Sequence, residues 1–213
     1  TERTGIKRRH FCNDDEGNVS MAVKAATVAL EKVDIDISEI GCLVVSTFSG
    51  DYLVPSAACQ VQEKLGMRDD AICFDLNAAC SGFVFGMETI RGLLLQSDKK
   101  YGLLIGSECI SRRLDMQDRG TCILFGDGAG AVLFTLDADK GYTSVFGCHG
   151  DLEVINVPND ANEPGRVHMA GQATYKFAVS TVPKLIKKVV LKAGIEFEDI
   201  DAYICHQANA RIL

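Results

Sequence analysis

Apolar runs alternate with segments of helical periodicity along most of the chain. Residues 41–48 form a continuous apolar run, which is typical of a buried strand in a parallel sheet. Residues 19–33 carry apolar side chains at helical spacing, and either Asn18 or Ser20 is the expected cap of this helix. One side of this helix carries small and apolar residues, which predict a narrow packing face: Ala22, Ala25, Ala26, Ala29 and Leu30.

The same alternation continues to residue 206. Pro55 is expected to open a helix over residues 56–65, because proline is well tolerated at helix starts. Further elements are predicted in this order: a strand over 71–76, a helix over 81–96, a strand over 101–107, a polar loop over 112–120, strands over 121–124 and 130–136, irregular sequence over 151–165, a helix over 172–193 and an apolar strand ending at His206. Pro183 lies inside the last helix and predicts a kink or a later start. Strands alternating with helices indicate a layered α/β fold.

One weak internal repeat accompanies this pattern. Residues 35–46 align without gaps on residues 195–206, and each copy follows an amphipathic helix. Only two Ile pairs are identical. The similarity could therefore arise by chance, or because many helix–loop–strand segments share such a pattern. If the repeat is real, Ser46 and His206 lie at equivalent strand ends, where ligands gather in such sheets.

Bulk composition excludes several classes of protein. The 213 residues are 47% hydrophobic and 24% charged, as in an ordinary globular protein. A net charge of −7 and a pI near 5.1 argue against a nucleic-acid-binding surface. No apolar run approaches the roughly 18 residues of a membrane span, and the first residues do not resemble a signal peptide. The nine cysteines are odd in number and lack zinc-site spacing, which favours free thiols in the cytoplasm.

Cys80 is the leading candidate for chemistry. It follows an apolar strand and precedes a helix, with small residues on both sides. The N–H groups at a helix N-terminus favour a thiolate, and such placement can bring a cysteine pKa into roughly the 3.5–7.5 range. A thiolate there can attack a thioester. The alternative is a buried structural cysteine, which is the commoner role for this residue type.

His206 is the second candidate. It is one of four histidines and begins the polar segment His206-Gln-Ala-Asn-Ala-Arg211 directly after an apolar run. A histidine at a strand end is often only structural, but this density of donors favours a pocket rim. Nucleophile and base are therefore predicted to converge on one narrow channel, although 126 positions separate them.

Two other segments carry less information. Residues 125–131 are rich in glycine but match no phosphate-binding motif, so a tight turn between strands is expected there. Arg112, Arg113 and Arg119 flank a polar loop, and residues 7–9 are a basic run that most simply lies in solvent.

Seven segments together resemble β-ketoacyl-acyl-carrier-protein synthase III, a ketosynthase family with the thiolase fold. They occur in the family's order: Arg3-Thr-Gly-Ile-Lys-Arg-Arg, Pro55-Ser-Ala-Ala-Cys-Gln-Val-Gln62, the Cys80 turn, Asp118-Arg-Gly-Thr, Phe125-Gly-Asp-Gly-Ala-Gly-Ala, Met169-Ala-Gly and His206-Gln-Ala-Asn-Ala-Arg-Ile. The resemblance implies two pseudo-repeated βαβ halves in an α-β-α-β-α arrangement. Residues 1–138 would form the first half, without its first strand, and residues 139–213 would form part of the second.

The resemblance also implies roles for individual residues. Cys80 would accept the acyl group, and His206 would polarise the extender thioester. Arg3, Thr4 and Arg119 would contact the nucleotide end of coenzyme A, Gly171, Ala208 and Asn209 would line the pantetheine tunnel, Gln207 and Arg211 would face the carrier protein, and Val54 would lie at the end of the acyl pocket. Acyl-CoA and malonyl-acyl carrier protein would be the substrates of a homodimer that needs no metal or redox cofactor.

Three interpretations of the function follow. The first is the condensing enzyme that initiates fatty acid synthesis. The second is a related ketosynthase of secondary metabolism with another acyl donor or acceptor, and the third is a non-catalytic subunit of the same fold. The family's third catalytic residue, an asparagine, would lie beyond Leu213 and its adenine-stacking tryptophan before Thr1, so we expect a longer chain of about 300 residues.

Overall fold

The computed structural model describes residues 4–159 and 165–212, in two compact units. The sheet unit comprises residues 10–110 and 126–138. The α4 unit comprises the described residues among 1–9, 111–125 and 139–213. The predicted division into halves at residue 138 stays a prediction.

The sheet unit is built on four strands in the order β2-β1-β3-β4. These are β1 (Ile40–Ser46), β2 (Ile72–Leu76), β3 (Tyr101–Cys109) and β4 (Asp127–Thr135). β1 pairs in parallel with both β2 and β3, whereas β4 runs antiparallel to β3. Every residue of β1 is buried. The prediction of a buried parallel strand from its continuous apolar run is therefore confirmed.

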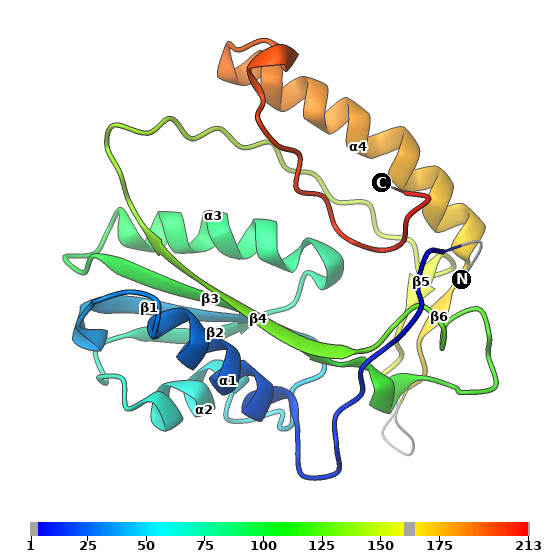
Figure 1. The fold of residues 1–213 in the computed structure, drawn as a ribbon, viewed down its shortest axis with the longest axis horizontal. Coiled ribbons are helices and arrows are strands. Elements are labelled where there is room, and N and C mark those ends of the chain that lie inside the picture. The colour runs from blue at the N-terminus through cyan, green and yellow to red at the C-terminus, as the bar shows by residue number, and fades with distance from the viewer. Residues whose placement is uncertain (1–3, 160–164, 213) are drawn as a thin grey trace. The chain divides into compact units, whose positions relative to one another are not determined.

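Helices cover both faces of this sheet (Figure 1). Alternate residues of β1 point to opposite faces, so Leu43 and Val45 pack with α1 (Asn18–Leu30) and α2 (Ala57–Leu65). Cys42 and Val44 pack instead with α3 (Gly82–Leu94). Two separate apolar cores result, and together they form the layered α/β arrangement that the alternation of strands and helices predicts.

The helix starts differ in detail from the prediction. Gly17 is the N-cap of α1, and Ser20 accepts a hydrogen bond from its N–H at 2.9 Å. Asn18 is buried inside the first turn, where its amide donates to Thr47 Oγ1 at 2.9 Å and to the Ser107 carbonyl at 2.7 Å. Neither Asn18 nor Ser20 is thus the cap, because tertiary partners for the Asn18 side chain outweigh local capping.

The start of α2 is fixed by two side chains. Ser56 is the N-cap and accepts a hydrogen bond from the N–H of Cys59 at 3.2 Å. Asp75 of β2 accepts hydrogen bonds from the N–H groups of Ala57 and Ala58 at 2.7 and 2.8 Å. Pro55 therefore precedes the cap rather than opening the helix. The carboxylate of β2 satisfies the donors that a helix start leaves unpaired.

The glycine-rich segment is a strand and not a turn. Residues 121–124 form turns, and β4 begins at Asp127, with Gly128 opposite Glu108 and Gly130 opposite Gly106. Pairing along all nine residues of β3 offsets the entropic cost of the glycines. Both expectations for this region, a strand over 121–124 and a turn over 125–131, are therefore wrong.

The α4 unit contains one long helix and a two-stranded sheet. α4 (Gly171–Ala193) is continuous through Pro183 and ends at Gly194, which has a φ of +69°. β5 (Ile155–Asn156) pairs with β6 (His168–Met169). The predicted helix over 172–193 is confirmed, and the later start predicted from Pro183 is wrong.

The internal repeat is partly visible in the backbone. A 3₁₀-helix spans Ile37–Glu39 in the first copy and Phe197–Asp199 in the second, at aligned positions. The next residues, Ile40 and Ile200, also have similar conformations, with φ and ψ of −80° and 111° and of −91° and 111°. After that the copies diverge, because Ile40 begins β1 whereas residues 201–207 form no strand. The predicted strand ending at His206 is wrong, since no described strand pairs with this segment.

None of the helices in the described part of the chain combines the length and hydropathy that a membrane span requires. All nine cysteines are described, and none of them forms a disulfide. Burial raises the pKa of Cys42 and of Cys73 to about 11, so these two remain protonated near neutral pH. They pack as small hydrophobic side chains, as the sequence interpretation predicts.

Candidate active site

Cys80 lies where β2 gives way to α3. A 3₁₀-turn, Ala79–Ser81, connects the two elements, and Ala79 adopts a φ of +44°, a conformation that non-glycine residues rarely adopt. Gly82 follows, and a Cβ at this position would collide with the Ser46 hydroxyl at the carboxyl end of β1. The turn is therefore packed tightly against the end of the sheet, and Cys80 is left exposed. Its predicted position at a helix start is confirmed.

The electrostatic surroundings of Cys80 differ from those expected. Although the residue is exposed, neighbouring atoms desolvate its thiol and raise the thiol pKa. A backbone hydrogen bond lowers this pKa, and the nearby charge of Glu108 raises it. The partial positive charge at the N-terminus of α3 also favours the thiolate. The lowered pKa expected from the helix start alone is thus wrong, because desolvation has the larger effect.

Glu108 is the acidic residue whose charge acts on Cys80, and it is not among the residues predicted from the sequence. Its carboxylate accepts hydrogen bonds from the Phe48 N–H at 3.0 Å, the Ser49 N–H at 3.2 Å, the Ser49 hydroxyl, and the Thr47 hydroxyl at 3.1 Å. Burial raises the pKa of Glu108, and these four hydrogen bonds oppose the shift. The carboxylate thereby organises the backbone that leaves the carboxyl end of β1. A lone acidic residue in an apolar strand was the available sequence signal.

The change Glu108→Gln is expected to shift the alkylation of Cys80 to lower pH. Removing a negative charge near a thiol lowers its pKa, so more thiolate is present at a given pH. The variant should also lose about 1–3 kcal/mol of stability, because an amide cannot accept all four hydrogen bonds. The rate of iodoacetamide labelling at Cys80, followed by peptide mass spectrometry against pH, measures the shift. Unfolding in urea measures the stability. An unchanged labelling profile would show that Glu108 has no electrostatic effect on Cys80.

His206 lies in the α4 unit on an irregular segment. Its ring is exposed, yet neighbouring atoms desolvate it enough to lower its pKa. The Ala208 N–H donates to the His206 carbonyl at 3.0 Å, which tightens the backbone after the histidine. A lowered pKa keeps the imidazole neutral at physiological pH, so one ring nitrogen can donate and the other can accept a proton.

The segment after His206 lies beside the start of the described chain. The Ala210 N–H donates to the Thr4 carbonyl at 3.0 Å, and a Cβ on Gly5 would lie 3.0 Å from the Ala210 Cβ. Asn209 Oδ1 accepts a hydrogen bond from the Arg211 N–H at 3.0 Å. The structure thus brings together Thr4, Ala208, Asn209 and Arg211, which come from opposite ends of the sequence.

The other predicted residues are placed as follows. Arg119 is exposed on a turn that Asp118 stabilises by accepting from the Gly120 N–H at 2.8 Å and the Thr121 hydroxyl at 2.7 Å. These hydrogen bonds lower the pKa of Asp118. Gly171 is the first residue of α4, and Gln207 is exposed. Val54 is 84% exposed. Arg3 lies outside the described residues.

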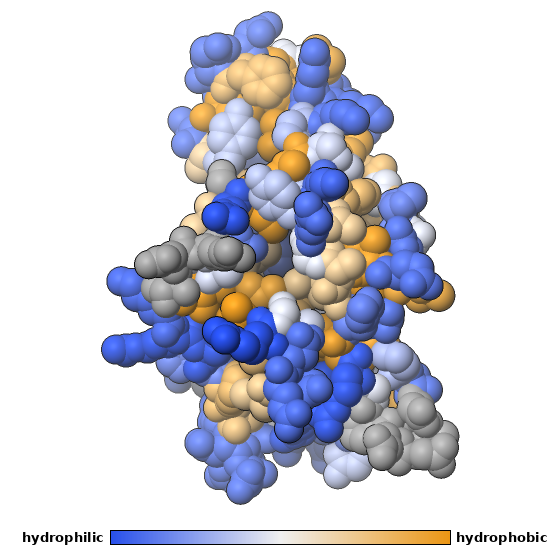
Figure 2. Space-filling view, turned by 90° about the vertical axis from the view of Figure 1, so that its right-hand side faces the viewer, coloured by the Kyte–Doolittle hydropathy of each residue, from blue (hydrophilic) through white to orange (hydrophobic). Residues whose placement is uncertain are grey.

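The surface combines polar and apolar groups. Figure 2 shows hydrophilic side chains interspersed with hydrophobic ones across the face that it presents. The exposed hydrophobic side chains include Tyr203 and Ile204, which come just before His206. Cys80 belongs to the sheet unit and His206 to the α4 unit. Their convergence on one channel stays a prediction.

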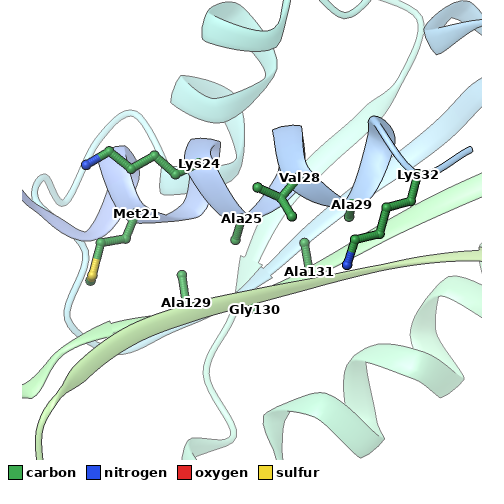
Figure 3. A pocket seen from close by; sticks show the side chains of 9 residues that line it. All are labelled: Met21, Lys24, Ala25, Val28, Ala29, Lys32, Ala129, Gly130 and Ala131. Atoms are coloured by element: carbon green, nitrogen blue, oxygen red, sulfur yellow. The ribbon is translucent and has the colours of Figure 1, made fainter. Parts of the chain in front are cut away.

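A shallow groove lies between α1 and β4 and was not anticipated. Its volume is about 440 Å³ (Figure 3), and Ala25 and Ala29 face Gly130 and Ala131 across it. Lys24 and Lys32 also line the groove, and the Lys32 side chain extends from α1 toward β4. The alanine spacing on α1 predicted a packing face, and the groove shows that part of this face remains open.

Comparisons with known proteins give this geometry its context. A family profile described as 3-oxoacyl-[acyl-carrier-protein (ACP)] synthase III matches residues 74–150, which include the Cys80 turn and β4. The β-ketoacyl-[acyl-carrier-protein] synthase III of Pectobacterium atrosepticum is 40% identical over 218 residues, which cover 99% of this chain and 68% of that protein. The chain belongs to the β-ketoacyl-acyl-carrier-protein synthase III family.

Further relatives agree with this family assignment. The synthase III of Clostridium acetobutylicum is 40% identical over 225 residues, covering 100% of this chain and 69% of that protein. The structure of the priming β-ketosynthase from the R1128 polyketide biosynthetic pathway superimposes with a TM-score of 0.92 at 30% identity, covering 100% of this chain and 66% of that one. The thiolase fold predicted from the seven segments is confirmed.

Proposed function

We propose that this synthase III catalyses the decarboxylating condensation of an acyl-CoA primer with malonyl-acyl carrier protein in fatty acid synthesis. The observation that carries the proposal is an exposed cysteine on a tight strand–helix turn, in a chain 40% identical over its length to synthase III enzymes. Acyl transfer through a covalent intermediate requires an accessible nucleophile, and the Cys80 sulfur can serve as one.

The first step is acylation of Cys80. Its thiolate attacks the carbonyl carbon of the acyl-CoA thioester, a C–S bond forms to Cys80, and the C–S bond to coenzyme A breaks. Coenzyme A leaves as a thiolate and takes a proton from solvent. The raised pKa of Cys80 means that only part of the enzyme holds the thiolate at neutral pH. Acylation is therefore expected to accelerate with increasing pH.

The second step is condensation. Malonyl-acyl carrier protein loses carbon dioxide, and the electron pair of the broken C–C bond forms an enolate. Its carbon attacks the acyl carbonyl, and Cys80 leaves as a thiolate. We propose that the neutral imidazole of His206 donates a hydrogen bond to the developing enolate oxygen, where such donors have their greatest effect. The lowered pKa of His206 supports a neutral ring in this role.

The remaining site residues are proposed to bind the thioester carriers. Thr4, beside Ala210, and the exposed Arg119 would contact the nucleotide of coenzyme A together with Arg3. Gly171, Ala208 and Asn209 would line the pantetheine path, and the exposed Gln207 and Arg211 would face the carrier protein. We further propose a cytoplasmic homodimer that uses no metal or redox cofactor.

Incubation with radiolabelled acyl-CoA, followed by malonyl-acyl carrier protein, tests the proposed function on the full-length protein. We expect label on the peptide that contains Cys80 and its transfer to β-ketoacyl-acyl carrier protein. Label on Cys80 without that product would favour the secondary-metabolite ketosynthase with another acceptor. Absence of label would favour the non-catalytic subunit.

The size of residue 54 is expected to set the length of the primer. Val54 stands where many members of the family carry a bulky aromatic residue at the end of the acyl pocket. The proposed acyl pocket of this protein should therefore admit longer or branched primers. The change Val54→Phe should lower kcat/KM for an eight-carbon acyl-CoA roughly tenfold or more relative to acetyl-CoA, because a filled pocket rejects the added methylenes. The exposed Leu53→Phe is the matched control, and a strict acetyl preference in the unmodified protein would contradict the hypothesis.

A further inference from the structure

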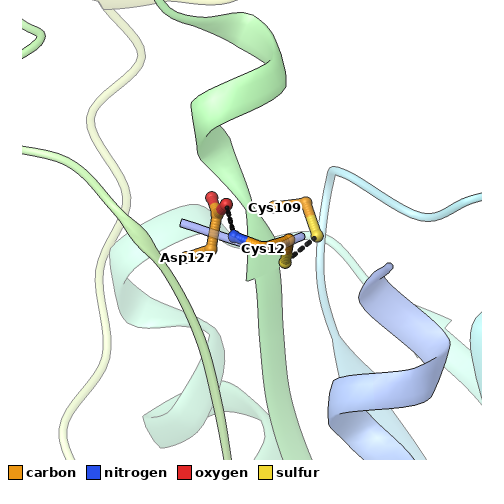
Figure 4. A group of neighbouring side chains, drawn as sticks. All are labelled: Cys12, Cys109 and Asp127. Carbon is orange, nitrogen blue, oxygen red and sulfur yellow. Dashed lines mark hydrogen bonds between the residues drawn. The ribbon is translucent and has the colours of Figure 1, made fainter. Parts of the chain in front are cut away.

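Two cysteines of the sheet unit lie in contact, far from each other in sequence. The Sγ atoms of Cys12 and Cys109 are 3.2 Å apart across a separation of 97 residues (Figure 4). The Sδ atom of Met21 lies 3.4 Å from Cys12 Sγ, and the carboxylate of Asp127 belongs to the same cluster. Neither cysteine belongs to the site proposed for acyl transfer.

Hydrogen bonds hold the backbones of both cysteines beside Asp127. The Cys12 N–H donates to Asp127 Oδ2 at 2.8 Å, and the Asp127 N–H donates to the His10 carbonyl at 2.8 Å. Cys109 is the last residue of β3 and pairs directly with Asp127. Its own N–H donates to the Ser49 hydroxyl at 2.8 Å. Asp127 therefore holds the backbones of Cys12 and Cys109 close to each other, through its side chain and through strand pairing respectively.

The two cysteines differ in their exposure to solvent. Cys12 is half-buried, whereas Cys109 is 1% exposed. A dissolved oxidant therefore reaches Cys12 first, and Cys109 is placed to react with whatever forms there.

The number of ligands, rather than the distance, favours a disulfide over a structural metal site. Two sulfurs on a tetrahedral zinc ion, each with a bond of about 2.3 Å, would lie about 3.8 Å apart. The observed 3.2 Å lies between the zinc and the disulfide values. Among the described residues only the Asp127 carboxylate joins the two thiols, whereas a structural zinc ion takes four protein ligands. Formation of a disulfide draws the two sulfurs closer, to about 2.05 Å.

We propose that Cys12 and Cys109 are a dithiol pair that a hydroperoxide converts into an intramolecular disulfide. The Cys12 thiolate attacks one peroxide oxygen, the O–O bond breaks, and Cys12 sulfenic acid forms with release of water once a proton is taken up. Cys109 then attacks the Cys12 sulfur, an S–S bond forms, and hydroxide leaves with the Cys109 proton as a second water. In total two thiols and one hydrogen peroxide give one disulfide and two waters.

The disulfide would close a long loop. It would tie the segment before α1 to the end of β3, next to Glu108. Cross-links across long loops restrict the unfolded chain strongly, so the oxidised protein should melt roughly 5 °C or more above the reduced one. A thiol reductant should reverse the shift.

Peptide mapping tests the proposal on the full chain after mild treatment with hydrogen peroxide. Trypsin releases residues 10–24 and 101–112 as separate peptides, and each contains a single cysteine. We expect their cross-linked product under non-reducing conditions, with the number of alkylatable thiols in the denatured protein falling from nine to seven. Cys12→Ala, a change at a half-buried position, should abolish both the cross-link and the rise in Tm.

A matched variant separates this pair from general oxidation. Cys59 is also half-buried, so Cys59→Ala should leave the cross-link between residues 10–24 and 101–112 unchanged. The proposal is overturned if peroxide yields other cysteine pairs, or if Cys12 accumulates as sulfinic acid without the cross-link. It is also overturned if Cys12→Ala shows the same rise in Tm as the unmodified protein.

Discussion

Replacing Cys80 with serine is expected to reduce acyl transfer from acyl-CoA by about a thousandfold or more. A serine hydroxyl without a strong base is a far poorer nucleophile than a thiolate at neutral pH, and its ester does not form at a useful rate. The fold should tolerate the change, because Cys80 is exposed and its neighbours Ala79 and Gly82 fix the turn through their own backbones. Protein-bound radiolabel after incubation with acyl-CoA measures the loss.

Cys148→Ser is the matched control, because Cys148 is the other exposed cysteine among the nine. Acylation of this variant should stay within about twofold of the unmodified protein. A Cys80→Ser variant that still carries a hydroxylamine-sensitive acyl group on another cysteine would show that Cys80 is not the nucleophile. A circular dichroism spectrum identical to that of the unmodified protein excludes misfolding as the cause of a loss.

The change His206→Ala is expected to separate the two steps of the reaction. Condensation should fall by roughly a hundredfold or more, since a donor aimed at developing enolate charge contributes on this scale. Acylation of Cys80 should be retained to a much larger extent, because that step proceeds from the thiolate. Single-turnover experiments on acylated enzyme, with carbon dioxide release from malonyl-acyl carrier protein as the readout, measure the second step alone.

His10→Ala is the control, since His10 is exposed and its backbone carbonyl, which the change retains, accepts the hydrogen bond from the Asp127 N–H. It should decarboxylate malonyl-acyl carrier protein at the unmodified rate. Equal losses of acylation and condensation in His206→Ala would assign this histidine to activation of Cys80 instead. No loss in either step would remove it from the site.

A strand was predictable from the sequence where its own residues show whether it is buried. The continuous apolar run of β1 predicted a central parallel strand, because only a strand covered on both faces lacks polar residues. The Cys80 turn was predictable for a related reason, since small residues between an apolar strand and a helix mark a tight connection. Resemblance of the seven segments then indicated the family. These inferences depend on local patterns that hold whatever the rest of the chain does.

Pairing partners were not predictable in the same way. The run before His206 is as apolar as a strand, yet it forms none among the described residues, because a strand exists only through hydrogen bonds to a neighbour. The glycine-rich segment looked like a turn, yet pairing with β3 makes it β4. In both places, whether the segment forms a strand depends on a pairing partner elsewhere in the chain. The composition of the segment itself does not show whether that partner is present.

The amino-acid sequence by itself determined the α/β class, the central strand, the cysteine at the start of α3 and the membership in the synthase III family. Only the tertiary structure decided the raised pKa of Cys80, the carboxylate of Glu108 beside it and the contact between Cys12 and Cys109. The physical reason is that desolvation, charge interactions and sulfur contacts depend on distances through space. Cys80 and Glu108 are 28 positions apart in the sequence, and Cys12 and Cys109 are 97 positions apart. Each pair comes together only when β3 lies in the sheet, next to the strands and segments that pack against it.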